Sequence, residues 1–437
     1  MRRPMSIANQ GNDEISIIYK AVGEGTRIMA NWSLGEKVDL LGPLGNCWEG
    51  FETSYPIIIG GGVIGASAQF SLAEAGIVNT KLLEMGTLAS GSTGRSQAIL
   101  RVHYSNEVTA NLAWHSLKIF REFADIVGTT SGYKKTGYLL AVGGDDAPAM
   151  RDNLSMHKRL GIDVSEVSSE YIRDICPGIR IEENEVFAYE PQAGYADPYA
   201  VTTGYANKAK ELGAFIEEST EVISICVSGG RVRGVQTEKY FLDTDTVIVS
   251  TGPWSGPLLK KVGVDLGLRT VRHQVIILRR QDGLLARHPA IGDVVNNYSA
   301  RPDLRNLTMI GVGEDERVGP QDYDECVDLQ VVERASESIV RRFPFMEDAL
   351  YSGGWSGLFT TTPDWHPVIG GIDGIEGLYC AVGFSGHGFK LAPMVGKVMS
   401  EIVVHGKSKS IDVSILNAHR FERQEFLRSR YGMQVLA

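Results

Sequence analysis

The fold of this chain is decided by the stretch Pro56-Ile57-Ile58-Ile59-Gly60-Gly61-Gly62-Val63-Ile64-Gly65. Three successive isoleucines that run into glycines predict a short, buried strand. The segment 67–75 has helical periodicity, Gly76 ends the predicted helix, and the segment 80–84 predicts the next strand. A strand, a helix and a strand joined by short connections indicate a βαβ unit, which is typical of a parallel sheet covered by helices.

The glycines of this stretch have the spacing G-x-G-x-x-G, at Gly60, Gly62 and Gly65. In dinucleotide-binding folds the first glycine allows a tight turn, the second lets the backbone approach a pyrophosphate, and the third lets the helix pack closely on the sheet. Glu84 ends the following predicted strand, where an acid can bind a ribose 2′-hydroxyl and disfavours a 2′-phosphate. The same spacing also occurs in glycine-rich turns that bind nothing, but its place between a strand and a helix favours a dinucleotide.

Three remote segments favour FAD over NAD. The segment 246–254 resembles the second strand and turn that flavoproteins with two dinucleotide-binding motifs press against the cofactor. Ser90-Gly91-Ser92-Thr93-Gly94-Arg95-Ser96 resembles the loop that runs beneath the flavin, and the segment 383–390 resembles the turn that holds its pyrimidine end. An NAD dehydrogenase would need none of these segments.

Together these segments resemble the D-amino-acid-oxidase superfamily. Within it the chain is most similar to monomeric sarcosine oxidase and to the beta subunits of sarcosine oxidase and dye-linked L-proline dehydrogenase. The resemblance runs from Tyr55 to the C-terminus and is most specific over residues 89–104 and 360–393. It implies an FAD enzyme that oxidises the C–N bond of a small secondary amino acid (sarcosine, another N-methyl amino acid or proline) by hydride transfer to the flavin, leaving an imine.

The resemblance also assigns the residues of a site. Arg101 matches an arginine that clamps the substrate carboxylate and Lys390 matches its lysine partner, since two converging cations can fix a carboxylate. The expected catalytic residues are Arg101, Lys390, His387 and Tyr298. The expected cofactor-binding residues are Gly60, Gly62, Val63, Ile64, Gly65, Glu84, Ser92, Arg95, Ser96, Val222, Thr251, Gly252, Gly386, His387, Gly388 and Lys390. No metal site is expected.

Each catalytic assignment has a structural alternative. Arg101 could form an internal salt bridge, and Lys390 could be a solvated lysine at a helix end. The ring of His387 could face the substrate or only pack beside it. Tyr298 falls where the family keeps a substrate-facing tyrosine, but a role in core packing explains it equally well.

The chain departs from its relatives at three positions. Gly357 stands where monomeric sarcosine oxidase carries a cysteine linked to its flavin, and Arg95 stands where dimethylglycine-type relatives carry a linking histidine. These two residues predict FAD bound without a covalent link. Counting on from Tyr298, Met309 stands where oxidases of the family keep a lysine over the flavin, which favours a dehydrogenase.

The predicted fold class is α/β with mixed α+β character, in three parts. Residues 55–135, 195–265 and 356–437 form a discontinuous Rossmann-type FAD domain with two dinucleotide-binding motifs, and residues 136–194 and 266–355 form a mixed-sheet substrate domain. Residues 1–54 form a short β extension that resembles part of the electron-transfer subunit of dihydroorotate dehydrogenase, including Arg2-Arg3-Pro4-Met5-Ser6.

Composition limits the partners and the compartment. The chain has 437 residues, of which 43% are hydrophobic, and a formal net charge of −10. An acidic chain without a basic cluster gains nothing from a nucleic acid or an anionic membrane. We see neither a signal peptide nor a transmembrane run, and five widely spaced cysteines without a C-x-x-C pair fit reduced thiols in the cytoplasm. The five are Cys47, Cys176, Cys226, Cys326 and Cys380.

Two other functions remain open at this point. One is an FAD-dependent 2-hydroxy-acid or glycerol-phosphate-type dehydrogenase. The other is a non-catalytic flavin electron-relay subunit of a larger complex, which the N-terminal segment suggests. The expected partners are therefore a small amino-acid substrate and an electron-acceptor protein or other subunits.

Overall fold

A computed structural model describes residues 7–10, 15–17, 55–281, 288–312 and 316–431. The chain falls into two compact units, Met1–Thr53 and Ser54–Ala437. In the first unit, strand β1 (Ile7–Gln10) pairs antiparallel with β2 (Ile15–Ile17). Residues 38–41, whose apolar pattern predicts a further strand, lie outside the described residues. So does most of the segment that carries the N-terminal resemblance, and the role of residues 1–54 therefore stays a prediction.

The second unit contains the predicted parallel sheet. Its strands, in spatial order, are β11 (Phe215–Glu217), β4 (Lys81–Leu83), β3 (Ile57–Ile59), β15 (Val247–Val249), β23 (Leu378–Val382) and β22 (Val368–Gly371). Neighbouring strands are parallel except β22, which runs antiparallel to β23. The βαβ unit expected from the opening stretch is therefore present, with β3 and β4 side by side.

This sheet is buried on both faces, and successive side chains of each strand point to opposite faces. Ile58 packs into a core with the helices, whereas Ile57 and Ile59 pack into a second core with β12 (Val222–Ser228) and β13 (Arg231–Thr237). Strands buried on both faces consist of continuous apolar runs instead of alternating patterns. That is why three isoleucines in a row were enough to predict β3.

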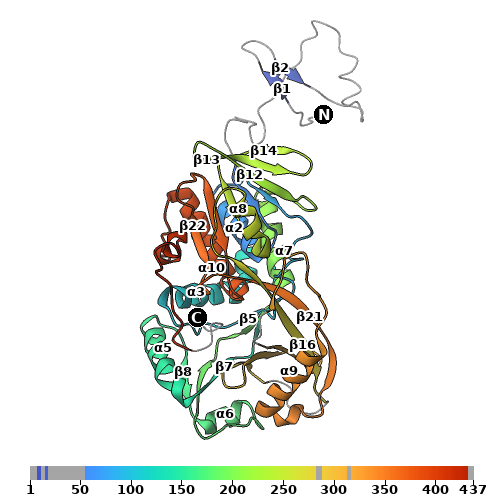
Figure 1. The fold of residues 1–437 in the computed structure, drawn as a ribbon, viewed down its shortest axis with the longest axis vertical. Helices are drawn as coiled ribbons and strands as arrows, with labels where there is room; N and C mark the ends of the chain where they lie inside the picture. Colours follow the sequence, from blue (N-terminus) through green and yellow to red (C-terminus); the bar gives the residue numbers. More distant parts are fainter. Residues whose placement is uncertain (1–6, 11–14, 18–54, 282–287, 313–315, 432–437) are drawn as a thin grey trace. The chain divides into compact units, whose positions relative to one another are not determined.

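Four helices pack together on one face of this sheet: α2 (Val63–Glu74), α3 (Glu107–Arg121), α7 (Pro198–Glu211) and α10 (Gly388–His405) (Figure 1). Gly396 lets α10 approach α2, since a Cβ there would lie 2.1 Å from Ser67 Oγ. The apolar pattern of residues 117–124 predicts a helix there, but the bounds that it predicts are wrong. α3 begins ten residues earlier because Asn106 caps it by accepting a hydrogen bond from the Thr109 N–H, and α4 (Phe123–Val127) follows after a break.

The second unit also contains a larger sheet. Its strands, in order, are β20 (Glu316–Arg317), β16 (Arg269–Arg279), β19 (Leu307–Val312), β18 (Tyr298–Pro302), β17 (Ala290–Asp293), β7 (Tyr138–Gly143), β9 (Glu185–Glu190) and β8 (Ser165–Val167). β21 (Leu350–Thr361) pairs along the other edge of β16, and both long strands curve through the lower part of Figure 1. β7 and β17 are parallel and the other pairs are antiparallel, so this sheet is mixed.

The remaining elements connect or cover the two sheets. β5 (Ile99–Leu100), β10 (Gly194–Tyr195) and β6 (Lys134–Lys135) form a small antiparallel sheet, and β14 (Phe241–Asp243) extends the β12–β13 hairpin. The other helices are α5 (Ala147–Arg159), α6 (Ser169–Ile175), α8 (Ser255–Lys260) and α9 (Leu329–Arg342). The predicted boundary between an FAD domain and a substrate domain stays a prediction, because residues 54–437 form one compact unit.

Candidate active site

The parallel strands open at their carboxyl ends into a cavity of about 1020 Å³. Gly60 after β3, Ser250 after β15 and Gly383 after β23 all line it. In open α/β sheets, ligands bind in the crevice outside the carboxyl ends of the strands. The volume lies at the upper end of the range for small-molecule sites, so the cavity suits an extended ligand such as a dinucleotide.

The glycine turn has the geometry that the sequence required. Gly60 has a φ of +109°, which L side chains rarely adopt. A Cβ on Gly65 would lie 2.0 Å from the Gly60 carbonyl oxygen, so a side chain there would drive the helix off the turn. Helix α2 starts at Val63 with no acid in its first turn, and its N-terminus faces the cavity through Gly62, Val63 and Ile64. A helix N-terminus of this kind favours a phosphate.

Glu84 is held in place by the backbone around it. One carboxylate oxygen accepts the Gly61 N–H at 2.6 Å and the other accepts the Gly86 N–H at 2.8 Å. The side chain lines the cavity and is acceptor-only when ionised. Its remaining lone pairs therefore suit the hydroxyls of a ribose, so the cavity residues fit a dinucleotide with a free 2′-hydroxyl.

The structure brings most of the expected cofactor residues to this one cavity. Those that line it are Gly60, Gly62, Val63, Ile64, Glu84, Ser92, Arg95, Ser96, Val222, Thr251, Gly252, Gly386 and Gly388. Gly65 lies behind the turn and acts through packing. His387 and Lys390 line a different cavity.

That second cavity is small, about 120 Å³, and contains all four expected catalytic residues: Arg101, Lys390, His387 and Tyr298. They come from β5 and its following loop, from the start of α10 and from β18. Several residues line both cavities, among them Ser96, His273, Phe359 and Gly386. The two cavities therefore share a wall.

Two cations face this small space. Arg101 is 6% exposed, and its guanidinium donates to the His103 carbonyl and lies 4.4 Å from the centre of the Tyr104 ring. Lys390 is half-buried in the first turn of α10. Burial and the charge of Arg101 hold the pKa of Lys390 well below its ordinary value, and Glu190 opposes them. An anion placed between the two cations would favour the charged form of both.

His387 is a buried, neutral ring in the wall of the small cavity. Its Nδ1 is 3.1 Å from the Tyr104 hydroxyl, and its Nε2 has no hydrogen-bond partner among the described residues. Burial, and then the charges of Lys390 and Arg101, lower the pKa of His387 well below its ordinary value. A buried polar atom without a partner points to a ligand, so the ring is available to a bound molecule.

Tyr298 lies in the core of the mixed sheet and also borders the small cavity. The hydroxyl has no partner with hydrogen-bond geometry among the described residues, although Asp293 lies close enough to act on it. Burial first, and then the charge of Asp293, raise the pKa of Tyr298 well above its ordinary value, so it is an un-ionised hydroxyl.

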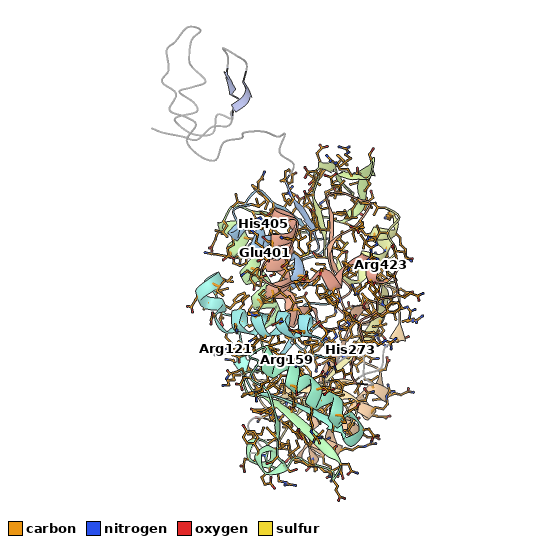
Figure 2. The ribbon with its side chains drawn as sticks, turned by 90° about the vertical axis from the view of Figure 1, so that its left-hand side faces the viewer. Arg121, Arg159, His273, Glu401, His405 and Arg423 are labelled. Atoms are coloured by element: carbon orange, nitrogen blue, oxygen red, sulfur yellow. The ribbon has the colours of Figure 1, made fainter. Side chains whose placement is uncertain are left out.

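Sequence reasoning missed three residues of the site. Thr93 accepts the Val63 N–H at 3.1 Å, and Tyr104 contacts both Arg101 and His387. Thr93 and Tyr104 both lie inside segments that the resemblance had already singled out, so they could have been predicted as site residues. His273, labelled in Figure 2, lines both cavities and stacks on Phe359 with 4.3 Å between ring centres. No sequence signal pointed to it, because it lies in the middle of an ordinary strand.

Met309 does not occupy the place expected from the count. It lies on β19 opposite Arg301 and Ile277, and it is absent from the described residues that line either cavity. Gly311, two residues on, lines the small cavity, and a Cβ there would lie 2.8 Å from His273 Nε2. The argument from Met309 for a dehydrogenase therefore loses its geometric basis.

Comparison with known proteins decides the family. The family DAO, described as FAD dependent oxidoreductase, matches residues 57–402. The chain belongs to this family. Because the family is FAD-dependent, the dinucleotide that the large cavity fits is FAD, and the enzyme is an oxidoreductase.

Individual relatives of this DAO-family chain are distant. It is 26% identical to the sarcosine oxidase subunit beta of an Arthrobacter species over 84% of this chain and 90% of that one. It is 23% identical to human mitochondrial dimethylglycine dehydrogenase, of which it spans 44%. Among solved structures, L-proline dehydrogenase from P. horikoshii has a TM-score of 0.80 at 27% identity and covers 86% of this chain and 100% of that one.

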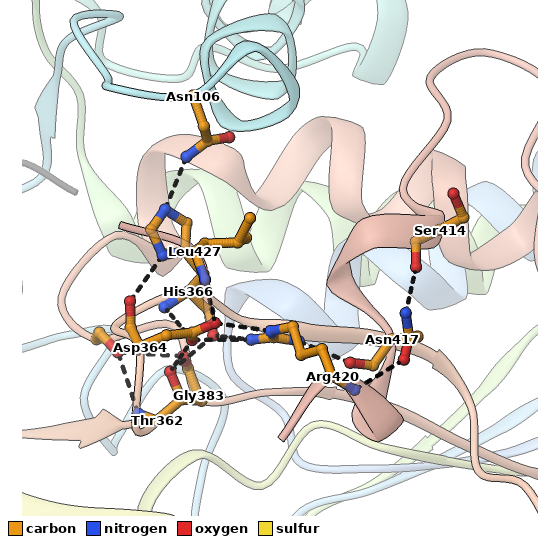
Figure 3. Close-up of polar contacts among 10 residues, drawn as sticks. Asn106, Thr362, Asp364, His366, Gly383, Ser414, Asn417, Arg420 and Leu427 are labelled. Atoms are coloured by element: carbon orange, nitrogen blue, oxygen red, sulfur yellow. Dashed lines mark hydrogen bonds and ion pairs between the residues drawn. The ribbon is translucent and has the colours of Figure 1, made fainter. Parts of the chain in front are cut away.

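The segment 362–370 holds the end of this DAO-family chain against the site (Figure 3). Arg420 donates to both carboxylate oxygens of Asp364, at 2.8 and 3.0 Å, and both side chains are buried. Burial alone would raise the pKa of Asp364, but the Arg420 guanidinium holds it below its ordinary value. Ser385 lies next to this network, within 3.4 Å of the Thr362 N–H. The network therefore fixes the glycine-rich turn that lines both cavities.

Two further observations concern the described residues. None of their helices is both long and apolar enough to span a membrane. Nor do their histidines, cysteines and acids form a group of three or more that could hold a metal ion.

Proposed function

We propose that this protein oxidises the C–N bond of a small secondary amino acid, of the sarcosine, N-methyl amino acid or proline type. The observation that carries the proposal is the pair of cations, Arg101 and Lys390, in a small cavity that shares a wall with the dinucleotide cavity. A carboxylate held by both would be oriented by charge-assisted contacts. Relatives named as acting on sarcosine, dimethylglycine and proline support the choice of an amino acid.

The residues of the chain would bind, orient and enclose the substrate. Arg101 and Lys390 would hold the carboxylate, which leaves the Cα–H and the nitrogen for the wall shared with the large cavity. The neutral His387 ring would offer its Nε2 to the amine, and Tyr298 would close the opposite side. A cavity of about 120 Å³ admits only a small side chain. FAD supplies the hydride acceptor, and water hydrolyses the imine after it forms.

The FAD is expected to be non-covalent. Arg95 and Gly357 lie against each other in the large cavity, since a Cβ on Gly357 would be 3.0 Å from the Arg95 Cβ. Neither residue can form a flavin linkage, and no cysteine is among the described residues that line either cavity. Acid or heat precipitation should release the yellow flavin into the supernatant. Colour that stays in the pellet would contradict this.

The decisive experiment is anaerobic reduction of the flavin by a panel of substrates. N-methyl and cyclic amino acids should bleach the flavin absorbance, and primary amino acids and 2-hydroxy acids should do so more slowly. Faster bleaching by 2-hydroxy acids would favour a hydroxy-acid dehydrogenase. Bleaching by none of them, with reduction by a partner protein, would favour an electron-relay subunit.

The electron acceptor is expected to be a partner protein or a dye, with oxygen slower. Relatives named as dehydrogenases of dimethylglycine and of L-proline support this expectation, and a relative named as a subunit of an oxidase supports a multi-subunit partner. The reduced enzyme would be mixed with air-saturated buffer or with an artificial acceptor, and reoxidation compared. Rapid oxygen-driven recovery with stoichiometric peroxide would make the protein an oxidase.

A further inference from the structure

Glu190 is a buried carboxylate that contacts the backbone next to Arg101. It ends strand β9 and is 1% exposed. One of its oxygens accepts the Val102 N–H at 2.7 Å and the other accepts the His103 N–H at 3.0 Å. Both donors follow Arg101 directly, so Glu190 fixes the backbone from which the guanidinium projects. The mechanism proposed above does not use this residue.

The groups around Glu190 form a compact set of charges. Glu190 interacts electrostatically with Arg101 and Tyr104, which lie on the segment that follows β5. It also interacts with Tyr138 on β7 and with Lys390 on α10. Burial raises the pKa of Glu190 to about 7, against the Val102 N–H and the charge of Arg101. Asp293, the acid among the described residues that line the small cavity, is already paired with Arg342 at 2.7 Å. Glu190 is therefore the carboxylate left to balance the two cations.

We propose that Glu190 is the counter-ion of the carboxylate clamp: it orients Arg101 through the backbone and opposes the loss of the proton from Lys390. This inference rests on the proposed function. Two like charges that face one small space oppose each other's ionisation, and a nearby negative charge relieves that opposition. Glu190 is thus a positioning residue, since it acts through Arg101 and Lys390 and does not line the cavity.

The charge role has a signature in pH that a purely structural role lacks. Below about pH 7 the wild-type Glu190 is itself protonated and resembles a glutamine. Above that pH the ionised carboxylate supports the charge of Lys390, and a glutamine cannot. Wild type and Glu190→Gln should therefore bind a carboxylate equally well in acid and differ in alkali.

The test measures binding of pyrrole-2-carboxylate, a planar carboxylate that cannot lose a hydride, to the FAD-loaded protein by calorimetry. From about pH 6 to about pH 9, the dissociation constants of wild type and Glu190→Gln should agree within about two-fold at the acid end and separate to roughly ten-fold at the alkaline end, the variant being weaker. Glu190→Asp keeps the charge and should restore the wild-type pH dependence. Glu183→Gln, an exposed acid just before β9, is the matched control and should follow wild type.

Two results would overturn the inference. Superimposed curves, or weakening of Glu190→Gln by the same factor at every pH, would exclude the counter-ion role. If Glu190→Gln does not fold, a pH dependence of Glu190→Asp unlike that of wild type would exclude it. Failure of wild type to bind the probe at any pH would instead refute the proposed function, and this inference with it.

Discussion

The large cavity is shaped mainly by backbone groups, whereas the small cavity is shaped mainly by side chains. The large cavity depends on backbone at the carboxyl ends of parallel strands, on glycines and on a helix N-terminus, with Glu84 held by two backbone N–H groups. The small cavity depends on buried, polar side chains from strands and helices far apart in the sequence. Backbone features leave local sequence patterns and converging side chains do not. The cofactor site could thus be predicted from its own residues, whereas the substrate site needed a resemblance.

The largest effect is expected in the large cavity. Gly62→Val should yield folded but colourless protein, with FAD affinity lower by at least roughly 100-fold, because the side chain would occupy the place of the pyrophosphate. The flavin absorbance per mole of purified protein measures this, with circular dichroism to confirm folding. Gly256→Ala in α8 is the control, since its Cβ would meet only Leu268 at 3.8 Å. A yellow Gly62→Val protein would contradict the assignment of this turn.

Variants of the proposed carboxylate clamp, Arg101 and Lys390, should lose catalytic activity without losing FAD. Arg101→Ala and Lys390→Ala should keep FAD bound but lose about 1.5–3 kcal/mol in transition-state binding, roughly ten- to a hundred-fold in kcat/KM. Steady-state kinetics with the best amino acid of the panel would show it. Lys397→Ala, an exposed lysine further along α10, should behave as wild type. Full activity in both clamp variants would mean that the carboxylate binds elsewhere.

Acid should destabilise the region behind the small cavity. Burial lowers the pKa of His157 from 6.5 to about 4, so the unfolded chain takes up this proton at a higher pH than the folded one does. Stability is then present above the ordinary pKa and is lost as pH falls from about 6.5 to about 4, by about 3 kcal/mol.

Thermal unfolding measured across this range would test the effect. His157→Gln should show a shallower loss of stability than wild type. The exposed His405→Gln should match wild type (Figure 2). Equal slopes in all three proteins would show that His157 does not contribute to the acid sensitivity.

The smallest effect is expected from the hydrogen bond that orients His387. Tyr104→Phe removes the hydroxyl 3.1 Å from His387 Nδ1 and should cost about 1 kcal/mol, roughly five-fold in kcat/KM. FAD content should not change, and the exposed Tyr171→Phe serves as control. A loss of flavin from Tyr104→Phe would mean that the two cavities are less independent than their linings indicate.

Particular residues show how far the sequence reached. The spacing of Gly60, Gly62 and Gly65 predicted the turn because Gly60 has a positive φ and Gly65 leaves no room for a Cβ, which are local steric demands. The start of α3 was missed because the buried residues of its first turns, Thr109, Ala110 and Ala113, are small or polar and give a weak apolar pattern. Met309 was misplaced because a count along a strand does not establish which of its residues face a cavity.

The sequence by itself determined the βαβ unit and the dinucleotide turn. Those features follow from local sterics and short-range hydrogen bonds, which are written into neighbouring residues. Only the tertiary structure brought Arg101, Lys390, His387 and Tyr298 into one cavity, since they come from segments nearly 300 residues apart. Only the structure brought Glu190 to the backbone next to Arg101, where it accepts the N–H of His103, a residue 87 positions away in the sequence. Long-range packing decides such contacts because a buried charge is tolerated only where distant segments supply its partners.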